Sequence, residues 1–319
     1  MHWRAILRLF GILLMFYSLN FVPSIIVSLY YQDGELNVFL LSMLSVIVIG
    51  LVLWQLNRNQ RQELSVRDGF LVVTLFWILL GLVGALPFLF GLHLDLTDAV
   101  FESISGFTTT GATVITGLDQ LPQSILYHRQ QIQWLGGMGI IVLAVAIMPL
   151  LGVGGMQLYR AETSGVAKDE KLTPRIAETA RSLWIIYLIL TSLCGIAYYF
   201  AGMTAFDAVG HAFTTVATGG FSTHDDSLAF YNSPLIELIA IVFMLAGGVN
   251  FAVHFIVFRK KLLSPYAKDP EVRTYGLVFL FASLFVAASL YLSNAYGSVA
   301  ESLRYAAFQV ASVLTSTGF

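Results

Sequence analysis

A short polar motif that occurs three times among apolar segments constrains this chain more than any other feature. Its copies surround Gly111 (FTTTGAT), Gly220 (ATGGFS) and Gly318 (TSTGF). The glycines are about a hundred residues apart, which indicates an internal repeat. A helix-length segment precedes each copy, and an apolar segment long enough to cross a bilayer precedes that. We therefore expect repeated units of one design, each with a polar loop inside the membrane.

The composition places the whole chain in a membrane. Hydrophobic residues make up 57% of it and charged residues 11%, with a mean hydropathy of +0.78. Soluble domains are usually about 45–50% apolar, so we expect an all-α integral membrane protein, because helices satisfy their own backbone hydrogen bonds in lipid. The single Cys194 excludes a disulfide framework. No His-Glu-x-x-His motif or nucleophile elbow is present, so we do not expect an enzyme.

Seven apolar segments have roughly the 20 residues that a bilayer core requires, and we expect them to span the membrane. They are 6–31, 36–56, 70–90, 132–151, 183–202, 235–258 and 275–292. Pro23 should kink the first of them, which neighbouring helices can tolerate.

The motif segments 98–111, 207–220 and 301–318 are too short and too polar to cross, so we expect them to enter the membrane and turn back. Backbone of this kind occurs at membrane depth only where it lines a water-filled cavity. The chain then divides into an N-terminal helix pair and helix–pore-loop–helix repeats, as in potassium channels. The boundaries are 1–62 for the pair and 63–160, 161–260 and 261–319 for the repeats, the third being incomplete.

The charged residues indicate the orientation. Of the 17 lysines and arginines, all but Arg129 and Arg304 fall on one side of this topology, which is cytoplasmic by the positive-inside rule. The cytoplasmic set is Arg4, Arg8, Arg58, Arg61, Arg67, Arg160, Lys168, Lys171, Arg175, Arg181, Arg259, Lys260, Lys261, Lys268 and Arg273. The outer acidic set is Asp33, Glu35, Asp95, Asp98, Glu102, Asp119, Asp207, Asp225, Asp226 and Glu301. Carboxylates at an outer mouth raise the local cation concentration, so the loops should open onto a negative vestibule.

Each re-entrant unit has the parts of a cation filter. Asp98 and Asp207 are expected to cap the outer N-terminal ends of their helices, which directs the negative helix ends toward the membrane centre. Glycine then permits the backbone angles that turn carbonyl oxygens inward, as in potassium-selective filters. In the third unit the acid at 301 is four residues farther from its glycine than in the other two. Its helix should therefore be about one turn longer or be capped differently, for example by Ser302.

Five stretches carry more specific motifs. They are 102–113 (ESISGFTTTGAT), 133–140 (QWLGGMGI), 156–162 (MQLYRAE), 173–180 (TPRIAETA) and 219–225 (GGFSTHD). Together they resemble the TrkH/KtrB family of bacterial potassium-uptake proteins, with TrkH the nearer of the two. The resemblance covers essentially the whole chain.

The resemblance implies an architecture and partners. Members of the family have an N-terminal helix pair and four pore-loop repeats around one pore, form homodimers in the inner membrane, and dock on a cytosolic ring of nucleotide-binding TrkA subunits. A basic cluster such as 259–261 is most often explained by topology and lipid contact, although it also lies on the face that TrkA would meet. Potassium would be the substrate, and neither a cofactor nor a nucleic-acid partner is expected.

Carried over by position, the filter would use three segments. They are Thr109, Thr110, Gly111 and Ala112; Thr218, Gly219, Gly220 and Phe221; and Ser316, Thr317, Gly318 and Phe319. Potassium itself would be bound through Thr110, Gly111, Gly219, Gly220, Thr317 and Gly318. Gly111 is the potassium-favouring choice of the family, since relatives with serine there lean toward sodium.

The chain ends one residue after Gly318, whereas the family has a fourth repeat. We expect either a fragment or a truncated gene product, and we expect residues 1–319 alone to insert in the membrane without transporting ions. The alternative function is a cation-coupled alternating-access symporter, which would use inverted repeats and a closed midplane site. Repeats of parallel orientation favour the pore. The residues leave open whether potassium moves alone or with protons or sodium.

Several residues have a structural interpretation beside the functional one. The glycine-rich segments 136–139 and 152–155 could form phosphate loops, but no strand precedes them and close helix packing is the better interpretation. His211 and His254 could relay protons, but hydrogen-bonded polar residues inside a bundle are commoner. Arg304 could bind a neighbouring carboxylate or extend to the outer interface, and both interpretations stay open.

Overall fold

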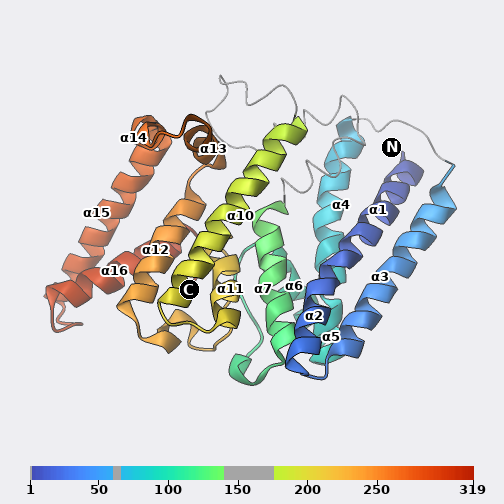
Figure 1. Ribbon diagram of the computed structural model, residues 1–319, viewed down its shortest axis with the longest axis horizontal. Helices are drawn as coiled ribbons and strands as arrows, with labels where there is room; N and C mark the ends of the chain where they lie inside the picture. The colour runs from blue at the N-terminus through green and yellow to red at the C-terminus, as the bar shows by residue number, and fades with distance from the viewer. Residues whose placement is uncertain (1, 60–65, 140–175) are drawn as a thin grey trace.

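The computed structural model describes residues 2–59, 66–139 and 176–319. These residues form helices and connecting loops, with no strand among them, as the composition predicts. Figure 1 shows the helices side by side in a bundle, with α1 and α3 at one edge and α15 and α16 at the other. The α-helices of the described residues are α1 (Trp3–Tyr17), α2 (Phe21–Tyr31), α3 (Leu36–Asn57), α4 (Val66–Gly84), α5 (Leu86–Gly91), α6 (Leu96–Phe107), α7 (Gln123–Gly137), α10 (Ile176–Phe200), α11 (Ala205–Val216), α12 (Pro234–Gly248), α13 (Phe251–Lys260), α14 (Ser264–Lys268), α15 (Pro270–Leu292) and α16 (Val299–Leu314).

Five of the predicted spans are confirmed as helices long and apolar enough to cross a membrane. They are Trp3–Tyr31, Leu36–Asn57, Leu71–Gly91, Arg181–Phe200 and Pro270–Leu292. The first is interrupted by a 3-10 turn at Ser18–Asn20, not at Pro23. Pro23 is the third residue of α2, where the backbone N–H would have no intrahelical acceptor in any case, so proline is tolerated there.

The predicted span 132–151 begins too late. Helix α7 starts at Gln123 and includes a polar stretch that hydropathy assigns to a loop. That stretch is helical because its polar side chains lie inside the bundle; the buried ones include His128, Arg129, Gln130 and Gln133. Residues 140–175 lie outside the described part, and with them the rest of this predicted span, the motif 156–162 and the glycines of 152–155.

The predicted span 235–258 is two helices and not one. Helices α12 and α13 are bent by 96° relative to each other. The break has a local cause, since Asn250 accepts a hydrogen bond from the Ala252 N–H at 3.0 Å and so caps the start of α13.

The pore helices α6, α11 and α16 have 12, 12 and 16 residues, which confirms the extra turn in the third. Their predicted caps are wrong. Thr204 caps α11 and Ser298 caps α16, each accepting a bond from the N–H of the acid three residues later. Asp207 and Asp98 lie within the first turn, where a carboxylate still complements the positive end of the helix dipole. The hydroxyl of Ser302 donates to the Ser298 carbonyl and caps nothing.

Glycine pairs in α7 and α12 set the packing of the pore helices. A methyl group added at Gly136 would overlap the carbonyl of Phe107 at the end of α6, and one at Gly137 would lie 2.9 Å from the Ala217 side chain after α11. The pair in α12 repeats this, since Gly247 faces the end of α11 and Gly248 faces Thr315 after α16. Each of these helices therefore packs between two successive pore helices, which confirms the packing interpretation of 136–139.

Candidate functional site

The three pore helices end in the same hydrogen-bonded turn. After α6, the Thr109 N–H donates to the Gly106 carbonyl at 3.0 Å and the Thr110 N–H donates to the Ser105 carbonyl at 2.9 Å. This pair of bonds defines a Schellman motif. The equivalent donors are Thr218 and Gly219 after α11, and Ser316 and Thr317 after α16. The predicted filter segments therefore leave their helices through one shared geometry.

Positive φ angles recur at two positions in every segment. The first is a hydroxyl residue, with φ of +54° at Thr109, +52° at Thr218 and +56° at Ser316. A left-handed conformation costs an ordinary residue about 1–2 kcal/mol. Its recurrence at the same position of all three turns therefore indicates that the surrounding structure imposes it. The second is the motif glycine, with φ of +76° at Gly111, +80° at Gly220 and +83° at Gly318. The predicted positive φ at these three glycines is confirmed.

The segments lie against one another. A methyl group added at Gly111 would overlap the Gly219 carbonyl oxygen and lie 3.2 Å from that of Thr317. One added at Gly220 would overlap the Thr317 carbonyl oxygen. Among the described residues no atom lies within 4 Å of the same position at Gly318. The structure thus brings the three segments together in chain order, with the third open on one side.

The carbonyl oxygens of the segments differ in what they bind. Ser105 donates to the Ala112 carbonyl at 2.6 Å, and Ser312 donates to that of Phe319 at 3.2 Å. The side chain of Gln133 donates to the Gly219 carbonyl at 2.7 Å. Four other carbonyls accept no hydrogen bond from the described residues. They belong to Thr110, Gly111, Gly220 and Thr317. These are the oxygens free to face a cation.

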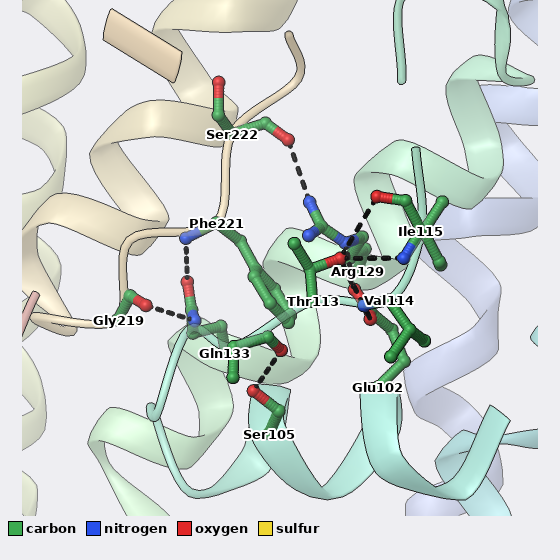
Figure 2. Close-up of polar contacts among 11 residues, drawn as sticks. Glu102, Ser105, Thr113, Val114, Ile115, Arg129, Gln133, Gly219, Phe221 and Ser222 are labelled. Carbon is green, nitrogen blue, oxygen red and sulfur yellow. Dashed lines mark hydrogen bonds and ion pairs between the residues drawn. The ribbon is translucent and has the colours of Figure 1, made fainter. Parts of the chain in front are cut away.

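A buried ion pair behind the first segment was not predicted (Figure 2). The Arg129 guanidinium binds the Glu102 carboxylate at 2.5 Å, and their side chains are 1% and 0% exposed. Glu102 also accepts bonds from the Thr113 hydroxyl at 2.9 Å and the Val114 N–H at 3.0 Å. The prediction that Glu102 lines an outer vestibule is therefore wrong, because its carboxylate is buried against Arg129 inside the bundle.

The same face of α7 holds the second segment. Arg129 donates to the Ser222 carbonyl at 2.9 Å, and its guanidinium lies 3.7 Å from the centre of the Phe221 ring. Gln133 accepts a bond from the Phe221 N–H at 3.0 Å while it donates to Gly219. The signal in the sequence was the spacing of Arg129 and Gln133, which places them on one helix face. The buried Phe221 side chain is part of this packing.

Comparison with known proteins identifies the family. A family model named TrkH, described as a cation transport protein, matches residues 35–319. The chain belongs to the TrkH family. It is 51% identical to the Trk system potassium uptake protein TrkH of Halomonas elongata and 50% identical to that of Escherichia coli K12. Each alignment covers 100% of this chain and 66% of the relative, so the chain spans just under two thirds of their length.

A solved structure agrees with this assignment. The crystal structure of the potassium transporter TrkH from Vibrio parahaemolyticus superposes with a TM-score of 0.86 at 45% sequence identity. The match covers 98% of this chain and 64% of that one. Membership of the TrkH family, together with five helices able to cross a bilayer, makes this a multi-pass membrane protein.

In this TrkH-family chain His211 occupies the position in α11 that Glu102 has in α6. Its ring nitrogens lie 2.9 Å from the Asp207 carbonyl and 3.0 Å from the Ser222 hydroxyl. Ser222 in turn matches Thr113, the partner of Glu102. Both nitrogens of His254 are also bonded, to Tyr266 and Ala246. The two histidines are thus hydrogen-bonded residues of the bundle.

Polar contacts join the loops that follow the first two predicted filter segments. The Gly117 N–H donates to the Asp225 carboxylate at 3.0 Å, and His224 donates to Asp119. The bond from His224 holds the pKa of the Asp119 carboxyl below its ordinary value. Asp207, predicted to line the vestibule, is buried and accepts bonds from Thr204 and Thr223. Part of the predicted acidic mouth is therefore engaged in holding loops together.

A second ion pair settles the two interpretations of Arg304. Its guanidinium binds the Glu237 carboxylate of α12 at 2.9 Å and lies over the Tyr305 ring. The side chains are 27% and 11% exposed. Arg304 therefore connects the third pore helix, α16, to α12 of the preceding unit.

Proposed function

We propose that this chain is the pore-forming part of a Trk potassium-uptake system in the bacterial inner membrane. The observation that carries the proposal is one backbone turn that recurs three times, each with a positive-φ glycine and each packed on the next. Carbonyl oxygens arranged in this way can replace the hydration shell of a cation. The relatives' names, potassium uptake proteins, support potassium as the substrate.

The ion would meet the carbonyls of Thr110, Gly111, Gly220 and Thr317, which have no protein donor among the described residues. Gly219 fits as well, because a carbonyl has two lone pairs and Gln133 uses one of them. Gly318 is the corresponding residue of the third segment. Ala112 and Phe319 are in the same position as Gly219, because a serine of their own pore helix uses one lone pair of each carbonyl.

An alternating-access symporter fits the arrangement less well. Inverted repeats would place successive units in opposite senses across the membrane. Figure 1 instead shows α4, α10 and α15, the first helices of the three units, starting at the same end of the bundle. This parallel arrangement supports a pore with all three loops opening to one side.

We further propose that the protein works as a homodimer and docks on a cytosolic ring of the TrkA type. The name Trk system, given to the relatives, is consistent with more than one component. The end of α13 offers an exposed basic surface for such a partner, formed by Arg259, Lys260 and Lys261. Neutralising Arg181, Lys260 and Lys261 together should weaken TrkA capture in a pull-down, and capture at wild-type affinity would contradict the docking site.

The test of the function is rubidium flux through the complete gene product in proteoliposomes. We expect uptake that potassium inhibits at much lower concentration than sodium does. Gly111→Ser should reduce this preference, because a side chain there changes both the backbone and the ligand field of one segment. Absence of flux from the wild type would contradict the pore, and unchanged competition in the variant would remove Gly111 from the filter.

A further inference from the structure

The polar face of α7 lies where the chemistry of a lipid-embedded bundle disfavours charge. Arg129 and Glu102 are almost completely buried and 2.5 Å apart. A buried ion pair is seldom the most stable choice, since well-packed apolar residues of similar volume often stabilise a protein as much. The bonds that the pair makes to other groups therefore indicate what it does.

Those bonds reach the two segments that the pair separates. Glu102 holds the backbone and hydroxyl just after the first segment, at Val114 and Thr113. Arg129 holds the carbonyl just after the second, at Ser222. The distance between the two segments thus depends on a continuous chain of hydrogen bonds through one carboxylate and one guanidinium (Figure 2).

Gln133 completes the arrangement one helical turn along α7. Its carboxamide accepts from the Phe221 N–H and donates to the Gly219 carbonyl, at 3.0 and 2.7 Å. These groups lie on either side of Gly220. A side chain that fixes both fixes the orientation of the peptide units around this glycine.

We infer that Glu102, Arg129 and Gln133 are positioning residues that set the spacing of the first two filter segments and thereby the preference for potassium over sodium. The inference rests on the proposed function. Selectivity in a carbonyl filter depends on the position and number of its carbonyl dipoles. Residues that hold the carbonyls from behind therefore control selectivity without touching the ion.

The repeat supplies an internal comparison. The glycine pairs of α7 and α12 make equivalent contacts with the ends of pore helices. Counting back from the pairs places Ala240 at the position equivalent to Arg129, and Met244 at that equivalent to Gln133. Both of these α12 residues are buried and apolar. Packing of a pore helix against its neighbour thus does not require the polar groups of α7. Those groups therefore have a function other than helix packing.

The experiment uses the complete gene product in proteoliposomes and three variants. Gln133→Met installs the residue of the equivalent α12 position and removes two bonds without leaving a charge unpaired. Glu102→Gln removes the charge that Arg129 meets. Glu237→Gln is the matched control, because the Glu237–Arg304 pair joins two helices without a bond to a filter segment in the described residues.

The readout is the ratio of the sodium and potassium concentrations that halve rubidium uptake, which does not depend on how much protein folds. We expect this ratio to fall about tenfold in Gln133→Met, as the loss of two hydrogen bonds allows, and at least as far in Glu102→Gln. It should stay within about twofold in Glu237→Gln. Gln133→Met carries the test if Glu102→Gln fails to accumulate.

The outcomes separate the two proposals. A wild-type protein without rubidium flux contradicts the proposed function itself. A selective wild type with an unchanged ratio in Gln133→Met overturns the positioning role alone. An equal fall in Glu237→Gln also overturns it, because the effect would then reflect general loosening of the bundle.

Discussion

The junction between the first and second predicted filter segments and the junction between the second and third have the same backbone geometry and differ in their side chains. In both, a positive-φ glycine faces a carbonyl of the next segment, Gly219 in one case and Thr317 in the other. Among the residues that the structure describes, only the first junction is bridged by buried polar side chains of the helix that lies between the two segments in the chain, α7. The repeat therefore determines the path of the backbone, while each junction acquires its polar contacts separately.

The two ion pairs show the same difference in another form. Glu102–Arg129 is buried at the first junction, whereas Glu237–Arg304 is partly exposed between α12 and α16. Burial makes the first pair sensitive to the loss of either member, since the other is left charged in a poorly hydrated environment. Loss of one partner should therefore destabilise the protein more at the buried pair than at the partly exposed pair.

The largest expected effect separates Gly220 from Gly318. In Gly220→Ala the new methyl group would overlap the Thr317 carbonyl oxygen, and the backbone is also left-handed. We expect rubidium uptake to be lost. In Gly318→Ala only the conformational cost of roughly 1–2 kcal/mol applies, so uptake should fall by about tenfold. Equal loss in both would indicate that polypeptide outside the described residues packs against Gly318.

The next effect compares the ion pairs. Glu102→Ala leaves the Arg129 charge buried, and we expect a loss of about 3–5 kcal/mol of stability. Glu237→Ala removes a partner from a more exposed arginine and should cost about 1 kcal/mol or less. Thermal unfolding in detergent should show a much larger fall in Tm for the first variant. Similar falls would contradict the difference in burial.

A smaller effect compares two glycines of the pairs that seat the pore helices. Gly136→Ala places a methyl group on the Phe107 carbonyl, where backbone must move, at a cost of about 1–3 kcal/mol. At Gly248 the nearest atom is the Tyr275 hydroxyl at 2.5 Å, the end of a side chain that can rotate away. Gly248→Ala should therefore unfold at a higher temperature than Gly136→Ala. The reverse order would show that the Tyr275 ring is held in place.

The smallest effect concerns the loops beyond the first junction. The pKa of Asp119 is lowered by the bond from His224, so the contact stabilises the folded protein above the unfolded pKa, near 4. This contribution is lost as the pH falls through the lower folded value. Asp119 is well exposed, so Asp119→Asn should lower stability by at most about 1 kcal/mol at pH 7. Tm values of variant and wild type should converge as the pH falls below the pKa of the unfolded carboxyl, and a constant difference would assign the effect to another cause.

The sequence predicted the parts of the fold that depend on local chemistry. Apolar length located five spans, and the Thr-Gly motif located the three turns, because only glycine adopts positive φ without strain. The break between α12 and α13 was missed, although Asn250 is a good helix cap, because apolar residues on both sides gave one continuous hydropathy signal. At this point of the chain the helix-cap signal of Asn250 is weaker than the apolar signal of its neighbours.

The polar core of the site could not be predicted in this way. Arg129 lies in a stretch whose hydropathy is typical of a loop, and its partners are 27 and 93 residues away in the chain. No spacing rule relates such distant positions. Burial of Glu102 and Arg129 follows from their contact with each other, and that contact exists only in the folded bundle.

The glycine pairs of α7 and α12 have a consequence for the way the protein is made. A chain leaves the ribosome from its N-terminus, so α7 reaches the membrane before α11, whose end lies against Gly137. In the same way α12 precedes α16, whose end lies against Gly248. The second and third pore helices therefore arrive after the glycine that faces each of them, whereas the first, α6, precedes its partner Gly136. A defect in α7 would pass to every later unit, whereas a defect at Gly248 would leave the first junction already complete.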